Sequence, residues 1–236
     1  MKKLLVIAVF ALFSASSAIS ASLTPSIGIS GNKAGFAAHG VETRFNESGV
    51  LNGSVEEHGA FAEDYASVFL ELGIGEVVAI GIDYVPDSIS TPTNFSREGT
   101  GSPKSGGTLS NNPGSSSVSA DFEDLTTAYI KMNVLPLGGT YLKVGFSQVD
   151  VIVNDKMASG NTYKDVNTEG YMVGLGYDHS LSNGLSIRAE VAANSYDDVQ
   201  TDNGVTTASE SNGGQNKIKI KSMWSARGTV SLVKSF

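Results

Sequence analysis

Eight segments of this chain alternate apolar and polar side chains, and several of them carry charged side chains at mid-segment. The clearest runs from Leu185 to Ala193, where Leu185, Ile187 and Val191 alternate with Ser, Arg and Glu. A period of two residues is typical of a β-strand whose two faces meet different surroundings. The sequence therefore predicts an all-β protein, and no helical segment is needed to explain it.

The predicted strands are separated by connections of two kinds. The eight strands cover residues 26–44, 68–72, 78–84, 128–134, 142–147, 171–177, 185–193 and 217–236. Short turns are predicted at 73–76, 135–139 and 179–184, and long polar loops at 46–58, 87–117, 155–166 and 200–215. All six prolines fall outside the predicted strand interiors, as hydrogen-bonded ladders require.

The two faces of the strands distinguish a membrane barrel from a soluble β-sandwich or a lipocalin-like barrel, which would also alternate. One face carries seven charges in mid-strand: Glu71, Asp83, Lys131, Lys143, Arg188, Glu190 and Arg227. In the last segment, Lys217, Lys219 and Lys221 share the alternation of Arg227. The other face is apolar and suits a lipid-exposed band. A sheet that spans a membrane must also close into a barrel, because unpaired backbone groups at an open edge are not tolerated in hydrocarbon. We therefore expect an eight-stranded antiparallel transmembrane barrel.

Aromatic residues on the apolar face are predicted to form two interfacial girdles. They are Tyr84, Phe122 and Trp224 toward the long loops, and Tyr177 and Phe236 toward the short turns.

The N-terminus has the pattern of a secretory signal peptide. Lys2 and Lys3 precede the apolar run 4–13, and a tail of small residues follows. The run is too short to cross a bilayer, which takes about 20 residues. Residues 1–21 are therefore predicted to be removed, with cleavage after Ala18, Ser20 or Ala21, and residues 22–236 to form the exported barrel.

Composition excludes several functions. The chain has 236 residues, a formal net charge of −8 and no cysteine. An acidic protein is a poor partner for nucleic acid, and without thiols there is no cysteine-bound zinc or thiol catalysis. His58 follows Glu56 and Glu57 in a predicted loop, but no nucleophile stands in a defined relation to it. We predict no catalytic, cofactor or metal site; a lipid- or peptide-modifying enzyme using His58 is the weaker alternative.

The seven mid-strand charges suggest two further hypotheses. Buried charges are tolerated when they are paired, and the interior of an eight-stranded barrel is nearly filled by side chains. A network that plugs the lumen is therefore predicted, with a structural or surface-interaction role for the protein. The alternative is a narrow porin-like channel lined by Lys143, Arg188, Glu190 and Arg227.

At residue level the chain resembles small bacterial outer-membrane barrels of the opacity-protein and OmpA-like type. Residues 174–178 with 185–190 are similar to the penultimate hairpin of that superfamily, and 138–145 to its β-turn-β signature. The terminal Phe236 is similar to the assembly signal of such barrels, although Lys234 stands where an apolar residue is usual.

The resemblance implies a location in the outer membrane of a Gram-negative cell, with short turns in the periplasm and long loops outside. It implies contact with membrane lipid and lipopolysaccharide, and with the barrel-assembly machinery through the C-terminal strand. We expect a monomer without a peptidoglycan-binding domain.

Overall fold

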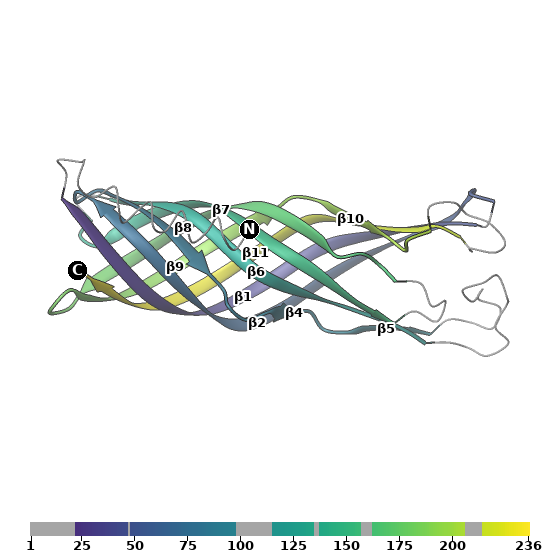
Figure 1. The fold of residues 1–236 in the computed structure, drawn as a ribbon, viewed down its shortest axis with the longest axis horizontal. Helices are drawn as coiled ribbons and strands as arrows, with labels where there is room; N and C mark the ends of the chain where they lie inside the picture. Colours follow the sequence, from purple (N-terminus) through teal and green to yellow (C-terminus); the bar gives the residue numbers. More distant parts are fainter. Residues whose placement is uncertain (1–21, 47, 98–114, 135–136, 157–161, 206–213) are drawn as a thin grey trace.

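The computed structural model of the protein describes residues 22–46, 48–97, 115–134, 137–156, 162–205 and 214–236 (Figure 1). The predicted signal peptide lies outside the described residues. The strands are β1 (Leu23–Phe45), β2 (Leu51–Ile74), β3 (Val78–Tyr84), β4 (Ile89–Ser90), β5 (Asn94–Arg97), β6 (Ser115–Asn133), β7 (Thr140–Lys156), β8 (Val166–Ser180), β9 (Leu185–Tyr196), β10 (Val199–Asp202) and β11 (Asn216–Ser235).

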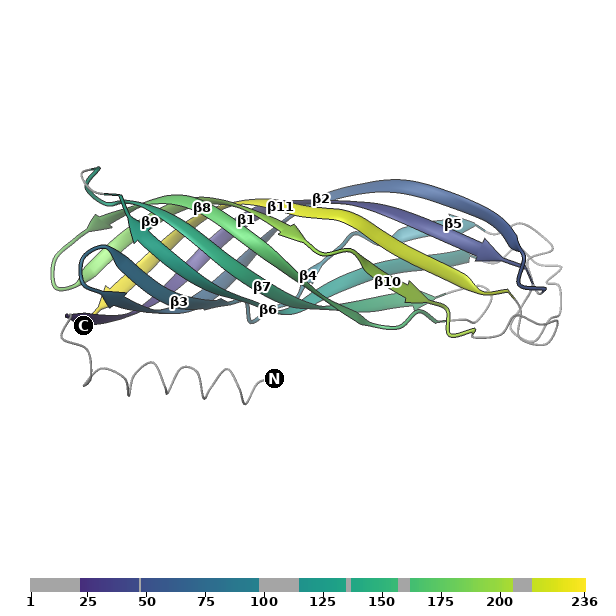
Figure 2. The ribbon, with the colours of Figure 1, turned by 90° about the horizontal axis from the view of Figure 1, so that it is seen from above.

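Eight of these strands close into a ring. The hydrogen-bonded order is β1-β2-β3-β6-β7-β8-β9-β11, and β11 pairs back onto β1, with Ser26 opposite Ser235. Every pairing is antiparallel, and the short strands β4, β5 and β10 attach to β6 and β11 (Figure 2). The predicted eight-stranded up-and-down barrel is therefore confirmed. No helix within the described residues is long and apolar enough to cross a membrane.

The strands extend well past the predicted ones at the long-loop end. The predicted loop at 46–58 is wrong, because β2 begins at Leu51 and pairs with β1 from there onward. Residues 51–60 are exposed on both faces, so they carry no alternation that the sequence could reveal. β1 has 23 residues and β2 has 24, whereas a tilted strand crosses a bilayer with about 9–11. The wall thus continues beyond the apolar band, and we call this part the extension.

In the half of the barrel near the short turns, apolar side chains point outward and polar ones point inward. Exposed side chains there include Ile29, Val173, Val191, Val230 and Leu232, whereas the alternate positions are buried. This distribution is inverted relative to a soluble barrel, and it is what hydrocarbon solvent requires. Trp224 lies on the outer face with 53% of its surface exposed, as predicted for a girdle residue.

Two β-bulges reverse this pattern farther out. Asp124 on β6 and Ser222 on β11 have φ angles of 53° and 50°, and the ladders β6–β7 and β1–β11 shift register beside them. A bulge adds one residue to a strand and so exchanges the faces of all residues beyond it. The prediction that Phe122 faces lipid is therefore wrong: Phe122 lies opposite the buried Val151 and packs inside the barrel.

The same correction applies to the three lysines of β11. Beyond Ser222, Ile220 lies opposite the buried Val199 and faces inward. Lys219 and its alternation partners Lys217 and Lys221 therefore face outward, opposite to Arg227. The membrane part of the wall is apolar outside, and the extension beyond the bulges is polar outside.

Candidate functional site in the barrel lumen

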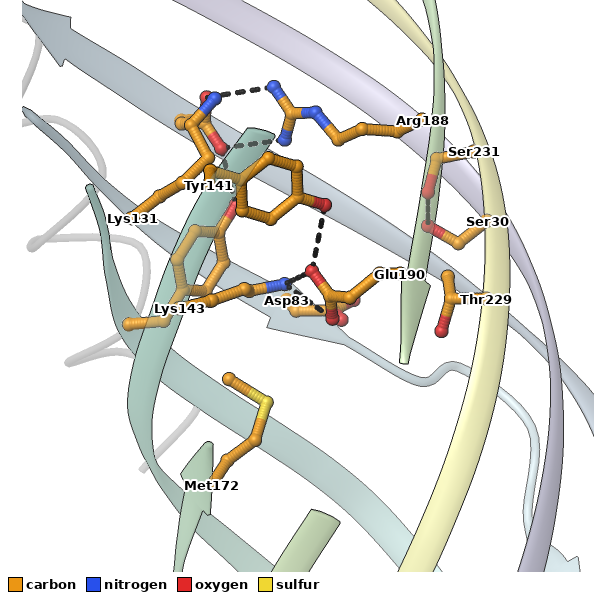
Figure 3. Close-up of polar contacts among 12 residues, drawn as sticks. Ser30, Asp83, Lys131, Tyr141, Lys143, Met172, Arg188, Glu190, Thr229 and Ser231 are labelled. Atoms are coloured by element: carbon orange, nitrogen blue, oxygen red, sulfur yellow. Dashed lines mark hydrogen bonds and ion pairs between the residues drawn. The ribbon is translucent and has the colours of Figure 1, made fainter. Parts of the chain in front are cut away.

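The first charged cluster of the lumen is centred on Glu71 of β2. Arg188 of β9 donates from Nη1 to Oε2 at 2.8 Å and from Nη2 to Oε1 at 3.0 Å (Figure 3). Lys131 of β6 places Nζ 2.7 Å from Glu71 Oε1. Arg188 Nε also donates to Asp178 Oδ2 at 2.8 Å, and Tyr129 donates its hydroxyl to Glu71 at 3.1 Å. A bidentate guanidinium–carboxylate pair is among the strongest polar contacts in proteins.

The second cluster is centred on Glu190 of β9. Lys143 Nζ lies 3.2 Å from Glu190 Oε2, and the Tyr141 hydroxyl donates to the same oxygen at 3.0 Å (Figure 3). Arg227 of β11 places Nη2 3.5 Å from Glu190 Oε1 and 3.7 Å from Asp83 Oδ2. This cluster therefore joins β3, β7, β9 and β11 across the lumen.

Tyr129 and Tyr141 connect the two clusters. Lys143 Nζ lies 4.1 Å from the centre of the Tyr129 ring, and Lys131 Nζ lies 5.3 Å from that of Tyr141. Both cations are thus placed over an aromatic face, where the ring quadrupole attracts them. Glycines make room for these rings: a Cβ at Gly81 would lie 2.4 Å from Tyr129 Cζ, and one at Gly176 would lie 2.3 Å from Tyr141 Cζ.

All seven side chains proposed from the sequence lie inside the barrel and are buried, and the structure joins them in these two clusters. Sequence reasoning missed Asp178, Tyr129 and Tyr141, which complete the clusters. The signal was present, because Tyr129 shares its alternation with Lys131 and Asp178 shares that of the buried Met172. With Asp178 the clusters contain four acidic and four basic side chains, so the formal charges balance.

An apolar layer lies on the long-loop side of the charged clusters. Its buried members are Val85, Ile89, Leu125 and Val149, and Phe36, Phe61, Tyr65, Phe122 and Tyr196 pack against them. The rings of Phe36 and Phe61 stack with their centroids 4.8 Å apart. The centroid of the Phe122 ring lies 6.3 Å from that of Phe36 and 6.4 Å from that of Phe61. The lumen is therefore filled by a charged layer and then by an apolar one.

His39 lies in the first strand, as the sequence predicted, whereas the predicted loop position of His58 is wrong. His58 lies on β2 and not in a loop, opposite His39 of β1, and the two rings stack with centroids 4.4 Å apart. Glu56 Oε2 lies 3.6 Å from His39 Nε2. Within the described part of the chain, no group of three or more His, Asp or Glu side chains is placed to hold a metal ion.

Comparison with known proteins finds a likeness in fold and none in sequence. No protein-family model matches the sequence, and no curated protein sequence does. Outer membrane protein OprG from Pseudomonas aeruginosa is similar in structure, with a TM-score of 0.51 and 8% identity over 89% of this chain and 95% of that one.

Two further solved structures match more loosely. Outer membrane protein AlkL matches with a TM-score of 0.42 and 11% identity over 89% of this chain and 90% of that one. Ail, the attachment invasion locus protein of Yersinia pestis, matches with a TM-score of 0.38 and 9% identity over 89% of this chain and 99% of that one. The likeness to OprG agrees with the strand order, so the chain has the fold of a small outer-membrane β-barrel.

Proposed function

We propose that this protein is a non-conducting outer-membrane barrel whose role is to present the extension for interaction at the cell surface. The observation that supports this proposal is the filling of the lumen by two successive layers. A solute on the barrel axis would have to break the ion pairs of Glu71 and Glu190 and then displace the stacked rings of Phe36 and Phe61. Both steps expose buried groups at a large free-energy cost.

The dimensions of the wall support the surface-interaction part of the proposal. β1 and β2 carry the wall far past the apolar band, and residues 51–60 of β2 are all exposed. A protein that served only as a plug in the bilayer would not need this structure. We propose no enzymatic role; His58, on which the enzymatic alternative rests, lies on β2 with its ring centroid 4.4 Å from that of His39.

The proposed location and partners follow from the outer face. The apolar band would contact membrane lipid and the acyl chains of lipopolysaccharide. The exposed Phe236 directly follows β11, and its backbone N–H donates to Pro25 O at 3.0 Å. We propose β11 as the segment that the barrel-assembly machinery recognises. We propose a monomer in the membrane, because the ring closes within one chain.

Planar-bilayer conductance tests the closed lumen. Purified protein that shows a heat-dependent gel shift should insert without conductance steps. A suitable positive control replaces Phe36, Phe61 and Phe122 by Ala together with Arg188→Ala, which removes side chains from both layers. Reproducible steps from the wild-type protein would overturn the proposal in favour of the narrow channel.

A further inference from the structure

β2 has a free edge at the long-loop end of the barrel. It pairs with β1 from Leu51 to Ile74 but with β3 only from Val68 to Ile74, because β3 stops at Tyr84. Beyond Tyr84 the chain turns to β6, with which β4 and β5 pair. Among the described residues, no strand pairs with β2 on that side between Leu51 and Ser67. Figure 1 shows the β1–β2 hairpin and β5 well apart at this end.

The register of β2 determines which backbone groups face this edge. Gly75 N–H donates to Ser22 O at 2.9 Å, so the pair of residues 22 and 75 is hydrogen-bonded. Hydrogen-bonded pairs alternate along an antiparallel ladder, so the odd-numbered residues of β2 bond to β1. The even-numbered residues direct their N–H and C=O groups to the other side. Along the outer part these are Ser54, Glu56, His58 and Ala60, up to the register shift of the β1–β2 ladder beyond Gly53.

The edge is accessible, and its described residues include neither of the two residue types most often used to block an edge, proline and lysine. Residues 51–60 are all exposed. Proteins commonly protect such an edge with proline, lysine or a covering loop, because a row of unpaired backbone groups invites another strand. The segment 51–67 contains neither proline nor lysine. An exposed edge of this kind is the template used in β-strand addition.

The charge along the edge selects the kind of strand that fits. Residues 51–67 contain Glu56, Glu57, Glu63 and Asp64 and no Lys or Arg. Asp64 is engaged by Lys33 at 2.9 Å and Glu56 Oε2 lies 3.6 Å from His39 Nε2, and the side chains of Glu56 and Glu57 are exposed on the two faces of the strand. Pairing with the same edge of a second copy would bring acids against acids, which is unfavourable for cross-strand neighbours. A partner segment that carries Lys or Arg would instead place opposite charges beside these acidic side chains, which is favourable for cross-strand neighbours.

We propose that the edge of β2 from Ser54 to Ala60 binds an extended, Lys- or Arg-rich segment of a partner protein as an added β-strand. The inference rests on the proposed surface-interaction function and names its partner by chemistry. Backbone hydrogen bonds supply the affinity, and Glu56 and Glu57 supply the preference for basic side chains.

A labelled peptide tests the inference on the full-length protein in phosphatidylcholine nanodiscs. The probe is a ten-residue peptide that alternates Lys and Val and carries ¹³C carbonyl labels; the same peptide with Glu for Lys and empty nanodiscs serve as controls. Fluorescence anisotropy measures affinity, and the labelled amide I band reports whether the bound peptide is a β-strand. Ala60→Pro removes one edge N–H where no partner strand depends on it, and Ala60→Thr retains it.

The wild-type protein and Ala60→Thr should bind the Lys peptide with a β-sheet amide I shift, and Ala60→Pro should bind it about tenfold more weakly, as for one lost hydrogen bond. The double variant Glu56→Gln, Glu57→Gln should weaken binding and reduce its salt dependence. Equal binding by Ala60→Pro, no β-sheet shift, or equal binding of the Glu peptide would overturn the inference. So would a dimer of the wild-type protein that Ala60→Pro dissolves.

The two proposals fail separately. Absence of peptide binding to a protein that stays silent in the bilayer removes the strand-addition inference and leaves the closed barrel. Conductance steps remove the proposed closed barrel, whatever the peptide does.

Discussion

Arg188 and Glu71, 117 residues apart in the sequence, form a buried bidentate ion pair across the lumen. The pair links β9 to β2, which are not neighbours in the ring. It therefore ties opposite parts of the wall together in addition to the backbone ladder. Removal of one partner would leave the other charge buried, and this is the costly way to break such a pair.

Replacement of Arg188 by Leu should lower the free energy of unfolding by about 3–5 kcal/mol, because Glu71 loses its bidentate partner, Asp178 loses its 2.8 Å contact, and Lys131 alone is left to face both buried carboxylates. Urea unfolding followed by the gel shift measures this. The control Lys33→Ala breaks an exposed pair with Asp64 and should cost less than about 1 kcal/mol. Conductance should stay absent in both variants because the apolar layer remains. A stable Arg188→Leu protein would show that the cluster does not hold the barrel.

Replacement of Gly176 by Ala should destabilise the barrel by about 1–3 kcal/mol, because the new methyl group would lie 2.3 Å from Tyr141 Cζ. The ring cannot yield without losing its hydrogen bond to Glu190. Gly31→Ala is the matched control, since a Cβ there has no atom within 4 Å. The same unfolding assay compares the two variants, and equal losses would contradict the packing argument.

The reversal of faces at Ser222 can be tested by cysteine labelling. The chain contains no cysteine, so only the introduced thiol can react. A thiol introduced by Lys219→Cys should react readily with a membrane-impermeant maleimide. One introduced by Ile220→Cys should react much more slowly, because that side chain faces the interior opposite Val199. Faster labelling at position 220 than at 219 would show that the bulge does not exchange the faces.

Asp198 should make the geometry of the bulge sensitive to acid. Its carboxylate pairs with Lys219 at 3.1 Å and accepts the Ser222 N–H at 3.3 Å. The hydrogen bond from Lys219, assisted by that of Ser222, holds the pKa of Asp198 below its usual 3.8. A carboxyl group whose pKa is lower in the folded than in the unfolded state stabilises the folded protein at pH values above the unfolded-state pKa. This stabilisation is lost as the pH falls through the folded-state pKa.

The expected result is that the hydrogen-exchange protection factor of the Ser222 amide falls as the pH is lowered below about 3.8, the ordinary Asp value. In Asp198→Asn the protection should be weaker and should not change over that interval. An identical decline in wild type and variant would assign the effect to another group.

Much of the membrane part of this barrel follows from the sequence. Arg188 and Glu190 alternate with Ile187 and Val191, and only hydrocarbon outside with paired charges inside accommodates that order in a spanning strand. The seven charges could therefore be assigned to one face without the structure. Their partners could not, because Arg188 meets Glu71 only through the register of the closed ring.

The outer half departed from the sequence-based prediction for two physical reasons. Residues 51–60 are in water on both faces, so no solvent difference imposes an alternation on them, and the sequence predicts a loop where β2 continues. Phe122 and Lys219 were assigned to the wrong faces because a bulge adds a single residue, which changes no composition and leaves the local alternation intact.

The alternation of side chains is enough to predict a β-barrel with a charged lumen and an apolar outer band, because solvent preference acts on each side chain separately. Only the folded chain shows which charges pair, where Asp124 and Ser222 exchange the two faces, and that none of the described strands pairs with the outer edge of β2. These properties depend on the register between strands distant in sequence, and hydrogen-bonded pairing sets that register only when the ring closes.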